Sequence, residues 1–153
     1  MTPQEDDGPL QEYLHLLPSV ILDCQFIEEG LKLYISCCYK IINAEVEEYF
    51  PFQLSGSDID KEPLGRLIDK FSKLTTNSDL VARLRKVTTA RNKVAHRGFL
   101  LTQEEQKDSR HIGKLITALK SLKTETRGLV MAVLNEWDVL EKKRRESQHA
   151  SNL

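Results

Sequence analysis

Cysteine is scarce in this sequence, and the three cysteines present match no metal-binding pattern. Cys24, Cys37 and Cys38 are odd in number, and none belongs to a CxxC pair. A zinc site needs about four ligands at characteristic spacings. We therefore expect no metal and no cofactor, and we interpret the cysteines as small apolar core residues in a reducing cytosol.

A targeting segment and a long apolar run are also missing. Residues 1–9 are acidic and contain neither the basic region nor the apolar region of a signal peptide. Charged residues interrupt the apolar runs well before the ~20 residues that a membrane-spanning helix needs. The net charge of −1 over 153 residues indicates no partner by itself, so any electrostatic signal must be local. We expect a cytoplasmic globular protein that contacts no membrane.

The sequence contains no Gly-rich phosphate loop, no HExxH motif and no nucleophile elbow, which excludes the enzyme classes that these motifs mark. Period-two alternation, the pattern of half-buried strands, is absent as well. Apolar residues instead recur at helical spacing in four segments, approximately 19–49, 63–74, 78–98 and 102–140. Gly30 costs the first of these helices about 1 kcal/mol, so we interpret it as a close contact with another helix.

Local signals indicate where these helices begin and end. Pro18 marks the start of the first, Pro63 suits the first turn of the second, and Gly98 terminates the third. Thr102 and Glu105 form a capping box at the start of the last.

We predict an all-α fold, a single helical bundle of about four to five helices, two of them long and two or more short. The bundle is expected to span residues 10–147, between a flexible acidic leader of residues 1–9 and a flexible tail of residues 148–153. No internal repeat and no second domain is visible.

One position in the third segment breaks the apolar pattern. Leu80, Leu84, Val87 and Val94 mark the apolar seam of the predicted helix, and Arg91 fills its remaining position. A buried, unpaired guanidinium is costly, so we expect an anionic or polar group to meet it. The candidates are a core carboxylate, a partner subunit or a bound phosphate.

Two acidic residues of the first segment could supply such a carboxylate. Glu28 and Glu29 lie in mid-helix, where one could face the bundle interior and meet Arg91 or His96. An exposed helix surface is the simpler interpretation for both, and we favour it.

The sequence around Arg91 is basic. Asn92 and His96 are four positions apart and so share one face of a continuous helix. No Asp or Glu occurs between Leu80 and Gln103. This local excess of positive charge indicates a polyanion-binding face, although many basic helix faces are only solvated. Its further cations are Arg83, Arg85, Lys86, Lys93 and Arg97.

Three stretches of the sequence together resemble the HEPN superfamily. They are residues 63–71, 84–87 and 90–96. That family is marked by an arginine, often with a polar neighbour, and by a histidine after four to six positions, which here correspond to Arg91, Asn92 and His96. The resemblance implies a bundle of about four helices, and it covers most of the chain in helix order.

Many HEPN proteins are metal-independent endoribonucleases that dimerise so that both copies of the motif line one cleft. The resemblance implies that Arg91 binds and neutralises the scissile phosphate, that Asn92 orients it, and that His96 transfers the proton. These residue types suit the chemistry, because an imidazole can accept the 2′-OH proton and a guanidinium stabilises charge on phosphoryl oxygens. The five further cations would bind the RNA backbone, and we expect a symmetric homodimer with Val87 and Val94 near its interface.

The resemblance further suggests a toxin or defence effector, with an antitoxin or regulatory protein as a second partner. Gly98 stands where the branch paired with a nucleotidyltransferase antitoxin usually has a tyrosine, so modification of such a tyrosine is not expected. The opening Pro63-Leu64-Gly65 is also similar to mannitol-operon-repressor-like regulators. The alternative function is therefore a non-catalytic helical interaction or regulatory module.

Overall fold

The computed structural model describes residues 8–98 and 103–152, apart from the side chains of residues 97, 98 and 103. These residues form helices and no strand, which confirms the predicted all-α bundle. The elements are α1 (Gly8–Val46), the short 3-10 turn η1 (Gly56–Asp58), α2 (Leu64–Ser72), α3 (Ser78–Gly98), α4 (Gln103–Lys107) and α5 (Ser109–Ser151).

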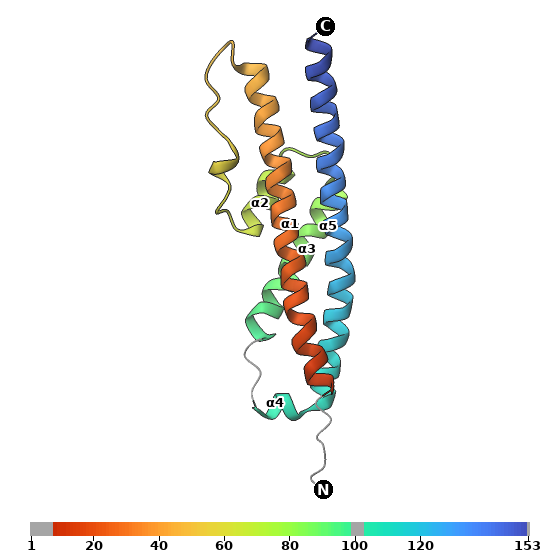
Figure 1. The fold of residues 1–153 in the computed structure, drawn as a ribbon. Helices are drawn as coiled ribbons and strands as arrows, with labels where there is room; N and C mark the ends of the chain where they lie inside the picture. Colours follow the sequence, from red (N-terminus) through yellow and green to blue (C-terminus); the bar gives the residue numbers. More distant parts are fainter. Residues whose placement is uncertain (1–7, 99–102, 153) are drawn as a thin grey trace.

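The two long helices, α1 and α5, run side by side in the same direction, with α2 and α3 packed against one side of the pair (Figure 1). Their parallel register is visible in the contacts that join them. Lys123 Nζ donates a hydrogen bond to the carbonyl oxygen of Ser19 at 3.3 Å, and Cys37 Sγ lies 3.2 Å from Glu141 Oε2, so both pairs are 104 residues apart in sequence. The chain therefore reverses direction through α3, which runs antiparallel to both long helices (Figure 1).

A single hydrophobic core lies among α1, α2, α3 and α5. Tyr34 of α1 and Phe71 of α2 make an edge-to-face contact in it, with ring centroids 4.9 Å apart. Its largest fully buried side chains include Leu31 and Ile35 of α1, Leu67 and Ile68 of α2, Leu84 of α3, and Ile112 and Leu119 of α5.

The predicted start of the first helix is wrong. Helix α1 begins at Gly8, and Pro18 lies inside it. A proline within a helix costs about 3 kcal/mol or more because it removes a backbone hydrogen bond. The turns before Pro18 nevertheless place Tyr13 and Leu17 in the core, each only 1% exposed, and burial contributes roughly 1.5–3 kcal/mol for each large apolar side chain. Burial thus outweighs the local stop signal, and the helix takes in the last residues of the expected leader; residues 1–7 lie outside the described part.

The last predicted segment is two helices. Asp108 separates α4 from α5, and its carboxylate accepts hydrogen bonds from the backbone N–H of Arg110 at 3.1 Å and of His111 at 3.3 Å. Asp108 is thus the N-cap of α5. The predicted capping box cannot be compared, because Thr102 lies outside the described residues.

Helix α5 also continues well past Leu140, to Ser151, and so includes part of the segment predicted as a flexible tail. Charged residues interrupt the apolar pattern of this last part of α5, and they stabilise the helix by pairing with one another. Glu141 accepts hydrogen bonds from Arg144 and Arg145, three and four positions later, and from Cys37 of α1. Pairs at these spacings stabilise a helix, and the contact with α1 anchors its far end.

Gly30 lies at a close approach of the two long helices. A Cβ atom at this position would lie 2.8 Å from Cγ1 of Val133, so only glycine fits without a shift. This confirms the interpretation of Gly30 as a close contact. The three cysteines are free and buried, as expected for core residues, and burial raises the pKa of each thiol to about 11.

Candidate functional site

Helix α3 carries the candidate site and is fixed at its start by Asn77. The side-chain oxygen of Asn77 accepts a hydrogen bond from the backbone N–H of Leu80 at 3.1 Å, and its amide nitrogen donates to Glu136 of α5 at 2.8 Å. The first contact caps the helix, and the second fixes its start relative to α5. The helix then continues without interruption to Gly98.

The seam of α3 faces the core as predicted. Leu80, Leu84 and Val87 are buried, Val94 is half-buried against the core, and Arg91 is half-buried between them. Val87 is only 3% exposed, so it offers a partner chain little side-chain surface, and its place near a dimer interface stays a prediction. Its side chain is already packed within its own chain.

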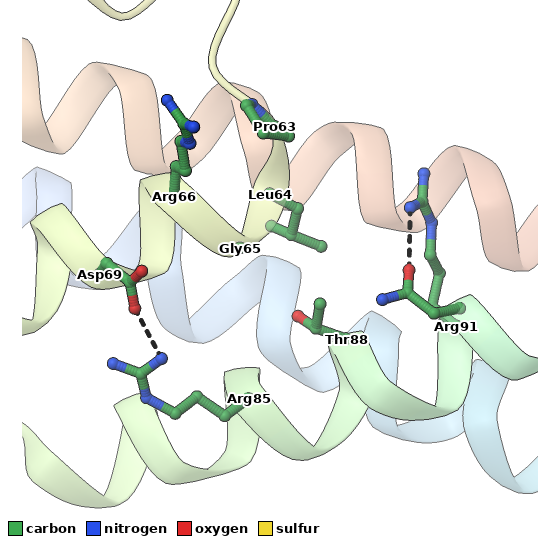
Figure 2. Close-up of a pocket in the computed structure, with 9 residues that line it drawn as sticks. Pro63, Leu64, Gly65, Arg66, Asp69, Arg85, Thr88 and Arg91 are labelled. Atoms are coloured by element: carbon green, nitrogen blue, oxygen red, sulfur yellow. Dashed lines mark hydrogen bonds and ion pairs between the residues drawn. The ribbon is translucent and has the colours of Figure 1, made fainter.

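Arg91 meets no carboxylate within the described part of the chain. Its Nη1 donates a hydrogen bond to Oδ1 of the neighbouring Asn92 at 3.3 Å, and its Nε is buried without a hydrogen-bond partner. The guanidinium is directed toward α1 (Figure 2), where its positive charge partly offsets the effect of burial on the pKa of Cys24.

Glu28 and Glu29 do not neutralise Arg91. Glu29 is exposed and pairs with Lys32 at 3.1 Å, as the favoured surface interpretation predicts. Glu28 is half-buried, and the described structure contains no ion pair between it and Arg91. Of the three groups expected to meet the guanidinium, a core carboxylate is therefore excluded among these residues, whereas a partner subunit and a bound phosphate stay open.

His96 and Arg91 do not converge within one chain. Five positions along a continuous helix correspond to about 500° of rotation and ~7.5 Å of rise, which leaves the two side chains about 140° apart. His96 is accordingly exposed, while Arg91 points into the bundle. Asn92 is exposed too, in keeping with the face that the sequence predicts it to share with His96.

A groove with a volume of about 400 Å³ lies between the start of α2 and the middle of α3 (Figure 2). We call it the α2–α3 groove; it is lined by Pro63, Leu64, Gly65, Arg66, Asp69, Arg85, Thr88, Arg91 and Asn92. It brings together Arg91, Asn92 and Arg85 of the predicted site, and His96 is not part of it. Arg66 and Thr88 also line the groove but are not among the predicted site residues, and their only signal in the sequence is their place in or near the stretches that carry the family resemblance.

Acidic residues of other helices lie beside the basic face of α3, although the stretch of sequence that forms this face contains none. Arg83 pairs with Glu125 of α5 at 3.0 Å, and Arg85 pairs with Asp69 of α2 at 2.8 Å. Both pairs are exposed, so each contributes little to stability but reduces the local positive charge.

Lys86 and Lys93 are exposed, and the described residues offer neither of them an ion pair. The side chain of Arg97 lies outside the described part. Among the described cations of the predicted face, Lys86 and Lys93 are therefore the ones whose charge no acidic neighbour offsets.

In residues 8–98 and 103–152, no group of three or more His, Cys, Asp and Glu side chains could hold a metal ion. None of the helices described is both long and apolar enough to cross a membrane. The chain matches no protein-family model, no curated protein and no solved structure, so the resemblance to the HEPN superfamily stays a prediction from its own residues.

Proposed function

We propose that this protein is a metal-independent endoribonuclease of the HEPN type that acts as a homodimer. The observation that carries the proposal is the state of Arg91. Its guanidinium is half-buried on an apolar seam. Within the described part of the chain its Nε has no partner, and it donates a hydrogen bond to a neutral amide, that of Asn92. A charge held in this way is costly unless an anion meets it, and a phosphate of RNA supplies that anion.

In the proposed reaction the 2′-oxygen of a ribose attacks the adjacent phosphorus. His96 accepts the 2′-OH proton, the bond from phosphorus to the 5′-oxygen breaks, and that oxygen takes up a proton as it leaves. The products are a 2′,3′-cyclic phosphate and a 5′-hydroxyl. Arg91 stabilises the charge that builds on the phosphoryl oxygens, and Asn92 orients the guanidinium through its side-chain oxygen.

A dimer makes the two halves of the motif meet. Because α3 is continuous, Arg91 and His96 of one chain point in different directions, whereas a two-fold axis can set Arg91 beside the partner's His96. Residues still exposed on α3, such as Asn92 and Lys93, are available for this interface. Val87 offers it little side-chain surface, because it belongs to the core.

A non-catalytic interaction or regulatory module is the second candidate. The observation that favours it is the separation of His96 from the α2–α3 groove, since a degenerate site would not need the two together. In either case we propose a cytoplasmic location. If the protein is a nuclease that acts as a toxin or defence effector, we expect an antitoxin or regulatory protein as a further partner.

RNA cleavage in EDTA tests the proposal. The wild-type protein is expected to cleave RNA and to leave DNA of the same sequence intact, because DNA lacks the 2′-OH nucleophile. His96→Ala should lose cleavage, while His149→Ala, which removes another exposed imidazole in the last turns of α5, should retain it. Equal activity of wild type and His96→Ala, or none from either, would favour the interaction module.

A further inference from the structure

Arg66 brings a third arginine to the α2–α3 groove, from a helix that the proposed reaction does not use. Its side chain is 74% exposed, and its ion-pair contact is Glu62 at 3.9 Å, close to the limit for such a pair. Glu62 is closer to Lys70, at 3.3 Å. Figure 2 shows the guanidinium of Arg66 directed away from α3, but the side chain is mostly exposed and its contact with Glu62 is long, so it can turn toward an anion in the groove.

The groove is electrostatically suited to an anion. Three arginines line it, Arg66 from α2 and Arg85 and Arg91 from α3, and Asp69 is the one acidic side chain among the lining residues described. Asp69 is already occupied by Arg85 at the end of the groove away from Arg91 (Figure 2). Arg91 has no ion pair among the described residues, Arg66 has only the 3.9 Å contact with Glu62, and the positive end of the α2 dipole adds to their charge.

The groove also has room beside the first turn of α2. A Cβ atom at Gly65 would meet no other atom within 4 Å, so the space next to this residue is open. The floor below is closed by Leu64, whose side chain is buried. A volume of about 400 Å³ lies within the ~300–1,000 Å³ of common ligand sites.

We infer that the α2–α3 groove holds a second phosphate of the bound RNA strand, next to the one at Arg91, and that Arg66 is its main ligand. The inference rests on the proposed function and deepens it. Arg91 acts on the scissile phosphate, whereas Arg66 contacts a neighbouring phosphodiester and fixes the path of the strand across α2 and α3. Contacts to non-reacting phosphates position a strand without reading its sequence.

The test measures binding apart from cleavage. A short fluorescein-labelled oligouridine is titrated with His96→Ala protein, which cannot cut it, and anisotropy is followed at several salt concentrations. In this background, Arg66→Ala is expected to weaken binding and to lower the salt dependence by about one phosphate contact. Gly65→Glu should weaken binding at least as much, by roughly tenfold or more, because it places a carboxylate inside the groove.

Gly65 offers matched variants that separate binding from folding. Gly65→Ala fills little of the groove and should bind like its parent. Both substitutions replace a glycine in a helix, and a glutamate near a helix N-terminus is favourable, so neither should lower the melting temperature. A loss of binding by Gly65→Glu at unchanged melting temperature would therefore report on the groove.

The outcomes distinguish the two proposals. If Arg66→Ala and Gly65→Glu bind like the parent while Arg91→Ala does not, the second phosphate site is overturned and the nuclease stands. If both variants lose binding but the wild-type protein cleaves no RNA, the groove is an RNA site and the nuclease fails. If the parent binds no oligouridine at low salt, both are overturned.

Discussion

At the scale of single residues, the shape of the Arg91 side chain matters as much as its charge. Arg91→Lys keeps a positive charge but loses the planar fork that spans two phosphate oxygens. We expect this variant to bind RNA nearly as well as the wild type and to cleave it ~10²-fold more slowly, the size of effect seen when one preorganised donor is lost. Single-turnover rates at saturating protein measure the difference.

The reverse exchange at a neighbouring cation is the control. Lys86 is exposed, so Lys86→Arg should leave the cleavage rate unchanged. Lys86→Ala should weaken RNA binding and lower its salt dependence by about one phosphate contact. Full cleavage by Arg91→Lys would show that Arg91 is only another member of the basic face.

Asp69 restrains the positive charge of the α2–α3 groove. Asp69→Asn removes the carboxylate that pairs with Arg85 at 2.8 Å and frees that guanidinium for a phosphate. RNA binding should tighten several-fold, and its salt dependence should steepen by about one contact. Asp60→Asn, an equal change of charge at an exposed position outside the groove, should do less, and an equal effect of both variants would point to net charge alone.

Glu141 should make the stability of the protein sensitive to acid. Hydrogen bonds from Arg144 are the main cause that lowers the pKa of Glu141 from 4.5 to about 2 in the folded chain. The unfolded chain therefore takes up this proton first, so the stabilisation is complete above pH 4.5 and is lost as the pH falls from there to about 2. Urea unfolding of wild type and Glu141→Gln across this range should show a smaller pH effect in the variant; identical pH profiles would rule out this residue as the cause.

At the scale of helices, the contact between α1 and α5 depends on Gly30. Alanine is a better helix former than glycine, but a Cβ here would meet Val133, whose β-branched side chain has little rotamer freedom in a helix. Gly30→Ala is expected to lower the free energy of unfolding by about 1–2 kcal/mol. Gly113→Ala in α5, where a Cβ meets nothing within 4 Å, should raise it by about 0.5–1 kcal/mol. Denaturant unfolding of both variants compares the two positions directly, and a stabilised Gly30→Ala would contradict the close packing.

Helix periodicity predicted the elements whose signals are local. The seam of α3, the start of α2 at Pro63 and the close contact at Gly30 all follow from spacing and residue type. The start of α1 does not, because the burial of Tyr13 and Leu17 that carries the helix past Pro18 depends on helices far along the chain. Asp108 is a residue type that favours the N-cap position, but the capping-box pattern of Thr102 and Glu105 indicated an earlier helix start.

Some features of the candidate site could likewise be predicted from local sequence, whereas others depend on how the helices pack. Arg91 could be identified from its place in the apolar seam, and its shortage of carboxylate partners agrees with that interpretation. The pairing of Arg83 with Glu125 and of Arg85 with Asp69 could not be predicted, because it requires the packing of α3 against α5 and α2. Arg66 could not be predicted as a site residue for the same reason, because only the fold brings it to the α2–α3 groove.

At the scale of the whole molecule, the proposed nuclease predicts complementation between two inactive variants. If each site combines Arg91 of one chain with the partner's His96, a dimer of Arg91→Ala and His96→Ala chains keeps one intact site. Mixing equal amounts of the two proteins with subunit exchange should restore about a quarter of the wild-type cleavage. Light scattering at micromolar concentration should show a dimer, and a monomer, or a mixture that stays inactive, would exclude the composite site.

The parallel pairing of α1 with α5 has a consequence for how the chain folds while it is being translated. Partners such as Cys37 and Glu141 are 104 residues apart, so the face of α1 that packs on α5 has no partner until α5 has been made. At translation speeds of about 5–20 residues per second, that interval is roughly 5–20 s. During it α2 and α3 can cover only part of the apolar side of α1, and the loop between α1 and α5 closes last. The nascent chain therefore exposes an apolar helix face for seconds, which is the kind of surface that makes folding intermediates prone to aggregate.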